Sequence, residues 1–123
     1  MKKSLRQIGV LEEFTLINLK QDVQIAHWQS TNYANHTVLG NLYAELEVQL
    51  DKLVELSITI EPLTFPKDTV LKLQDVSDKE IMDVLVFMSE TFNEMPQQPK
   101  ELENVLDDIR DVINQSIYLL RMN

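Results

Sequence analysis

The sequence predicts an all-α fold, namely a four-helix bundle with a long crossover between the second and third helices. Apolar residues recur every three or four positions along four long segments, which is the period of one face of an α-helix. Only two glycines and four prolines occur among the 123 residues, too few for the frequent turns of a β-sheet protein. Residues 1–123 are predicted to form one domain, which at this length buries enough surface to fold without disulfides.

The first helix is predicted over residues 4–29, and Ser4 is a suitable N-cap. Its apolar stripe consists of Leu5, Ile8, Leu11, Phe14, Leu19, Val23 and Ala26. Residues 30–32 are predicted to form a short break. The second helix is predicted over residues 33–60, with an apolar stripe of Leu39, Leu42, Leu46, Leu50, Leu53 and Ile60.

A long connection is predicted over residues 61–76, because Pro62 and Pro66 interrupt a regular helix there. A connection of this length is able to run from one end of a bundle to the other, which a tight helical hairpin is not. It distinguishes the predicted fold from a simple up-down-up-down bundle.

The third helix is predicted to open at Ser77, which stands three residues before Glu80 in the spacing of a capping box. Pro96 is predicted to end this helix. Pro99 suits the first turn of a fourth helix, with an apolar stripe that extends to Leu120.

The composition excludes several classes of site and partner. The chain has no cysteine, so disulfides, thiolate metal sites and cysteine nucleophiles are ruled out. Its formal net charge of −9, from 20 acidic and 11 basic residues, disfavours binding to nucleic acid. The one gathering of positive charge is Lys2, Lys3 and Arg6, and DNA compaction through this short arm is the least favoured function.

The hydropathy pattern predicts a cytoplasmic protein without a membrane partner. No stretch approaches the roughly 18 consecutive apolar residues that span a bilayer. Glu12 and Glu13 interrupt the apolar residues that follow the basic N-terminus, which argues against a secretory signal.

Four polar residues around the second predicted helix are candidate metal ligands. His27 and His36 flank the short break, and Asp51 and Glu55 lie one helical turn apart further along. Imidazole together with carboxylate suits Fe(II), Mn(II) or Zn(II). Each element alone has an ordinary structural explanation, since a carboxylate pair is usually a hydrated face and a histidine at a helix end is usually a cap.

The pattern of His27-Trp28, then His36, then Asp51-Lys-Leu-Val-Glu55 resembles the signature of the Dps-like ferritins. Those proteins carry His-Trp late in the first helix, a second His early in the second, and D-x-x-x-E fifteen residues after it. The resemblance extends to the helix count and to the crossover. Small Dps-like proteins of this kind are encoded by some phages and large DNA viruses, in which case the compartment would be the host cytoplasm.

This resemblance implies a ferritin-like bundle that assembles as a homo-oligomer, at least a dimer. It also implies an iron site between subunits, where Fe(II) is oxidised by peroxide or dioxygen. His27 and His36 would come from one subunit, and Asp51 and Glu55 from its two-fold partner. Trp28 would be the aromatic neighbour, in a cluster with Tyr33 and Tyr43 whose ordinary role would be packing.

A second hypothesis is a non-enzymatic interaction module that keeps the bundle and has lost the metal site. It is favoured by Gly40, because the Dps-like family usually has an Asp one helical turn after its second His. The paired histidines favour the metal-binding hypothesis.

Overall fold

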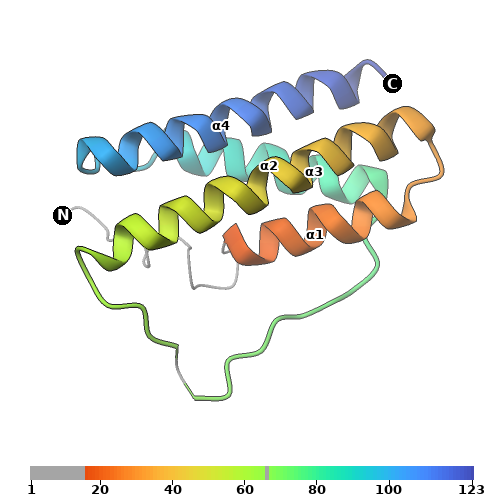
Figure 1. Cartoon of the computed structure of the whole chain (residues 1–123). Coiled ribbons are helices and arrows are strands. Elements are labelled where there is room, and N and C mark those ends of the chain that lie inside the picture. The colour runs from red at the N-terminus through yellow and green to blue at the C-terminus, as the bar shows by residue number, and fades with distance from the viewer. Residues whose placement is uncertain (1–15, 66) are drawn as a thin grey trace.

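The structure is a computed structural model that describes residues 16–65 and 67–123. Over these residues the chain is all-helical with no strand, and its four helices run side by side in one bundle (Figure 1). Their bounds are α1 Leu16–Gln29, α2 Tyr33–Ile58, α3 Asp78–Asn93 and α4 Lys100–Arg121. The predicted all-α fold is therefore confirmed, while the predicted start of the first helix at Ser4 lies outside the described residues.

Local side-chain chemistry explains where α2 and α3 begin. The Asn32 side chain accepts a hydrogen bond from the Asn35 N–H and caps α2. Ser77 caps α3 in a complete capping box with Glu80, as predicted. Pro99 differs from its predicted place, because it is the N-cap of α4 and the helix starts one residue later.

The helix ends differ slightly from the predicted ones. Helix α2 ends at Ile58, two residues before the predicted end. Thr59 still has a helical backbone, but its N–H donates to the nearby carbonyl groups of Leu56 and Ser57. The third helix ends at Asn93, before Pro96. A proline disfavours helical backbone in the residue before it, so α3 ends ahead of that position.

The core runs along the centre of the bundle and is filled mainly by aliphatic side chains. Helix α2 packs against α1 and α4, and α3 packs against α4 and, less extensively, α1. Leu39 and Leu53 of α2, Ile81 of α3 and Ile113 of α4 have no solvent exposure. All the predicted stripe residues of the second helix are buried except Ile60, which lies beyond the end of α2 and is 63% exposed.

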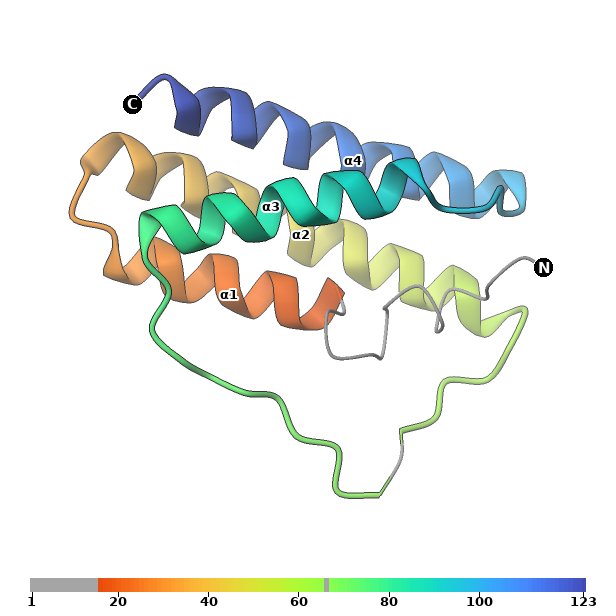
Figure 2. The same ribbon diagram turned by 180° about the vertical axis from the view of Figure 1, so that it is seen from behind.

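The connection between α2 and α3 runs back along the outside of the bundle. Figures 1 and 2 show it leaving the end of α2 and returning to the opposite end, where α3 begins. Helices α2 and α3 therefore point the same way, and each pair of packed neighbours is antiparallel. The described part of this connection has no helix, in agreement with the prediction made from its prolines.

Polar contacts hold together the end of the bundle where α1 ends and α3 begins. The Gln29 side chain donates to Asp75 Oδ1 and accepts from the Val76 N–H, both at 2.9 Å. The Asn35 amide donates to Asp78 Oδ2 at 3.1 Å and accepts from Asn123 at 2.8 Å. Because these contacts join α1, α2, α3 and the C-terminus, they hold the break between α1 and α2 in a defined place.

One carboxylate of α1 makes a pH-dependent contribution to stability. Burial raises the pKa of the Asp22 carboxyl above its ordinary value. The folded chain thus holds this proton more tightly than the unfolded chain, and the stabilising effect is lost as the pH rises through the raised pKa. We expect Asp22→Asn to increase the free energy of unfolding at neutral pH. This gain should shrink as the pH falls through the raised pKa and vanish below the ordinary carboxyl pKa, where the group is protonated in both states.

Urea denaturation of Asp22→Asn and of the wild type over a pH series measures this difference. The exposed Glu45 of α2 offers a control, since Glu45→Gln removes a carboxylate that faces solvent. A gain for Asp22→Asn that stayed constant across the acid range would contradict the assignment.

Candidate metal centre

His27 and His36 lie together across the break between α1 and α2. His27 is in the last turn of α1 and His36 is in the first turn of α2, and residues 30–32 reverse the chain between them. Their rings are stacked with centroids 4.0 Å apart and planes inclined by 18°. Both side chains are half-buried. The structure therefore brings together the two candidate ligands that the sequence places on either side of the break.

Each imidazole makes a hydrogen bond to the backbone of the other histidine. His27 Nδ1 lies 2.7 Å from the His36 carbonyl oxygen, and His36 Nδ1 lies 2.7 Å from the His27 carbonyl oxygen. A carbonyl oxygen only accepts, so both Nδ1 atoms carry the proton and donate it. In the neutral rings, each Nε2 therefore keeps an unprotonated lone pair.

The sequence explains why this reciprocal arrangement is stable. The carbonyl groups in the last turn of a helix have no partner within the helix. The His27 carbonyl at the end of α1 is in this position, and His36 supplies it with a donor. The two hydrogen bonds thus close the α1–α2 hairpin and hold both ring planes at the same time.

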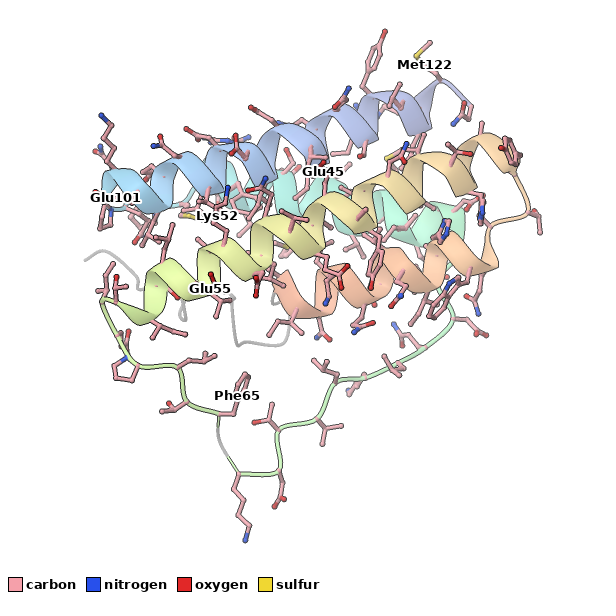
Figure 3. The ribbon with its side chains drawn as sticks, viewed as in Figure 1. Glu45, Lys52, Glu55, Phe65, Glu101 and Met122 are labelled. Carbon is pink, nitrogen blue, oxygen red and sulfur yellow. The ribbon has the colours of Figure 1, made fainter. Side chains whose placement is uncertain are left out.

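Asp51 and Glu55 form a separate carboxylate pair further along α2. Both are exposed, and no hydrogen bond or ion pair engages either side chain within residues 16–65 and 67–123. Figure 3 shows Glu55 projecting from the side of α2 away from α4, whereas Glu45 and Lys52 project toward α4. The pair therefore presents free carboxylate oxygens on the outer surface of the bundle.

A single chain does not bring the four candidate ligands together. The fifteen residues from His36 to Asp51 extend about 22 Å along α2 at 1.5 Å per residue. In the described part of the chain, no group of three or more potential ligand side chains lies close enough to hold a metal ion. A complete centre from these residues would require a second copy of the chain.

Two of the three aromatic residues near the break, Trp28 and Tyr33, are not packed inside the bundle. Trp28 is 65% exposed and Tyr33 is 83% exposed, because both point outward from α1 and α2. Tyr43 is half-buried against the core and does pack there. The exposed pair lies next to the two histidines on the outer surface.

Gly40 is a residue whose importance the sequence reasoning missed. It was interpreted only as a lost carboxylate, but in the structure the His27 ring lies directly against it. Glycine in the middle of a helix lowers helix stability. A glycine one turn after His36 is therefore a sequence signal that another group lies close to the helix at this position. Lys2, Lys3 and Arg6, the candidate DNA-binding arm, lie outside the described residues.

Comparison with known proteins places the chain in one family. Residues 27–120 match the family described as "Family of unknown function (DUF5856)", and since this range covers most of the chain, the chain belongs to that family. The matched range includes His27, His36, Asp51 and Glu55. No curated protein and no solved structure matches the chain significantly. No helix in the described ranges is both long and apolar enough to cross a membrane.

Proposed function

We propose that this protein binds a divalent metal, foremost Fe(II), at a site shared by two copies of the chain. His27 and His36 of one copy and Asp51 and Glu55 of the other would be the ligands. The observation that carries the proposal is the pair of Nδ1–H groups donated to backbone carbonyls. Metal-ligating histidines almost always donate their other ring N–H in this way, which fixes the ring and raises the basicity of the ligand nitrogen.

The donor set fits Fe(II) and related ions. Two imidazole nitrogens and two carboxylate groups suit Fe(II), with Mn(II) and Zn(II) as close competitors. The stacked rings lie close together, with centroids 4.0 Å apart, and each carries an unprotonated Nε2 when its Nδ1 donates to the backbone. The carboxylates bring the negative charge that a divalent cation requires, and no ion pair within the described residues competes for them.

The geometry of α2 supports a two-fold pairing of two copies. Exposed residues follow one outer stripe of this helix, namely Tyr33, Thr37, Ala44, Val48, Asp51 and Glu55. If two α2 helices cross antiparallel with the axis at Ala44, residues equally distant from it lie opposite each other. Thr37 would then face the partner's Asp51, and Tyr33 would face the partner's Glu55, which places both carboxylates beside the histidine pair.

The chemistry of this stripe is consistent with a buried contact between copies. Ala44, the residue at the proposed axis, is small and exposed, so two helices are able to approach closely there. Tyr33 and Val48 on the stripe are large apolar side chains that one copy leaves in water. Covering them would contribute to association in proportion to the apolar area buried.

A ferritin-like fold accounts for the path of the chain. The described parts of the connection support it, since they return along the bundle and leave α2 and α3 pointing the same way. This is the connectivity of bundles with one long crossover. In such bundles, facing helices supply metal ligands from fixed positions, and here α2 would supply ligands to both halves of the site.

The reaction we propose is the oxidation of Fe(II) as a substrate. Each of two Fe(II) ions loses one electron, and hydrogen peroxide accepts both electrons and two protons as its O–O bond breaks to give two waters. Dioxygen is the alternative oxidant. The part of the protein is to hold the ion in place through imidazole and carboxylate ligands.

An interaction module remains the second candidate, and the α2–α3 connection favours it. Several of its large apolar side chains are exposed: Ile60, Phe65, Val70, Leu71 and Leu73. Exposed apolar groups that are this concentrated are typical of surfaces that contact another protein. On this reading, the bundle would be a scaffold and the histidine pair would serve only to close the α1–α2 hairpin.

Aerobic addition of Fe(II) to metal-stripped protein distinguishes the two candidates. We expect Fe(III) to form faster than in buffer with the wild type, and at the buffer rate with Asp51→Ala. Because Asp51 is exposed and lies in no hydrogen bond or ion pair within the described residues, its replacement should leave folding intact. Glu45→Ala, on the side of α2 toward α4, is the matched control. A wild-type rate equal to that of buffer would reject Fe(II) oxidation.

A further inference from the structure

The His27 ring occupies the space that a side chain at position 40 would need. A Cβ atom built on Gly40 would lie 2.7 Å from His27 Cε1 and 3.0 Å from His27 Nδ1. Non-bonded carbon atoms make favourable contact at about 3.5–4.0 Å. Any other residue at this position would therefore push the ring away from α2, even though the helical backbone itself is open to every residue type.

The hydrogen bond of His27 explains why the ring has to approach this closely. Its acceptor, the His36 carbonyl oxygen, is also the one that the Gly40 N–H reaches across one turn of the helix. The ring must lie over Gly40 to reach that oxygen with Nδ1. Because Gly40 has no side chain, the His27 side chain of α1 is able to contact the backbone of α2.

We infer that Gly40 is a positioning residue for the histidine pair. By leaving room for the ring, it keeps the proton of His27 on Nδ1, where it donates to the His36 carbonyl, and leaves Nε2 unprotonated and able to bind a metal ion. The metal-binding part of this inference rests on the proposed function, whereas the effect on the His27 tautomer exists in the metal-free protein.

Gly40 therefore has a role of its own and is more than the absence of a carboxylate ligand. A carboxylate side chain at position 40 and the observed place of the His27 ring exclude each other. This chain therefore holds an imidazole against α2 where a side chain at position 40 would otherwise stand. The donor set on the histidine side of the site consists of nitrogen alone.

The first test is Gly40→Ala in the metal-free full chain, with the ring nitrogens of both histidines followed by ¹⁵N–¹H correlation spectroscopy. We expect the wild type to show a protonated Nδ1 and an unprotonated Nε2 on His27. The variant should lose this single tautomer. Asn41→Ala, at the next and exposed position of α2, should leave it unchanged. A variant that kept the wild-type tautomer on His27 would overturn the inference.

Thermal unfolding of a double-mutant cycle keeps the test independent of how well the single variant folds. Gly40→Ala should lower the melting temperature of the wild type, because the ring is displaced. In a His27→Ala background the space is free, and the same change should raise the melting temperature, because alanine favours the helix. The same shift in both backgrounds would show that the ring and the glycine do not interact and would overturn the inference.

Anaerobic titration with Fe(II) tests the metal-binding part. Loss of an interaction that orients a ligand typically costs 10–100-fold in metal affinity, and we expect a loss in this range for Gly40→Ala. An unchanged affinity would overturn the positioning role at the metal site. Failure of the wild type itself to bind Fe(II) would instead reject the proposed function, while the tautomer measurement would still decide the role of Gly40.

Discussion

Ala44→Glu is expected to convert a dimer of this protein into a monomer. In the proposed pairing, Ala44 lies on the two-fold axis, so the change would bring two carboxylates together in a contact that excludes water. An unpaired charge buried in this way costs several kcal/mol. We expect the dissociation constant of the dimer to rise by at least about 100-fold, or about 2.8 kcal/mol. Affinity for Fe(II) should fall with it, because each site needs both copies.

Sedimentation analysis over a range of protein concentrations measures this effect against the monomer mass of 14.3 kDa. Gln115→Glu adds the same charge at an exposed position on α4, outside the proposed contact, and should leave the dimer unchanged. A wild type that sediments as a monomer at every concentration would contradict the shared site. So would an Ala44→Glu variant that dimerises as the wild type does.

Ile113→Ala is expected to be among the most destabilising single substitutions in the bundle. Ile113 has no solvent exposure and lies in the core between α4 and its neighbours. Truncation of a fully buried isoleucine to alanine typically costs about 2–5 kcal/mol, because transfer free energy is lost and a cavity remains. This is a large part of the roughly 5–15 kcal/mol by which a native domain is stable.

Urea denaturation at one fixed protein concentration measures this loss, since association also contributes to apparent stability. Gln115→Ala, two residues along the same helix and exposed, is the control and should change the unfolding free energy little. A loss below about 1 kcal/mol for Ile113→Ala would show that this part of the core is not tightly packed.

The fold was predictable because short-range rules determine most of it. The capping box of Ser77 and Glu80 depends on a few consecutive residues, and it formed as predicted. The buried leucines of α2 follow from helical periodicity. The ends of helices were less predictable, since periodicity does not determine them. The Thr59 N–H donates to the carbonyls of Leu56 and Ser57, and Pro99 is an N-cap without a side-chain hydrogen bond.

The candidate site was predictable only in part, because its geometry depends on contacts across the break. The sequence places His27 and His36 on either side of the break, and the structure brings their rings into contact. The reciprocal hydrogen bonds and the contact with Gly40 could not be derived from spacing, since they depend on how α1 and α2 approach each other. The exposure of Trp28 was missed for a related reason, because which face of α1 is covered depends on its packing.

The central claim is that each metal site takes its histidines and its carboxylates from different copies, and a mixing experiment tests it most directly. One chain would carry His27→Ala with His36→Ala, and the other Asp51→Ala with Glu55→Ala. Neither chain alone should retain Fe(II). After the two are unfolded and refolded together, half of the dimers should be mixed, and each mixed dimer has one intact site out of two.

We therefore predict that the refolded mixture retains Fe(II) in about a quarter of the sites found in the wild type, as half of the dimers each carry half of their sites. The Fe(II) bound per chain is the quantity to measure, and a mixture of wild type with either variant calibrates it. A mixture that retains no more Fe(II) than the two variants do separately would contradict a site shared between copies.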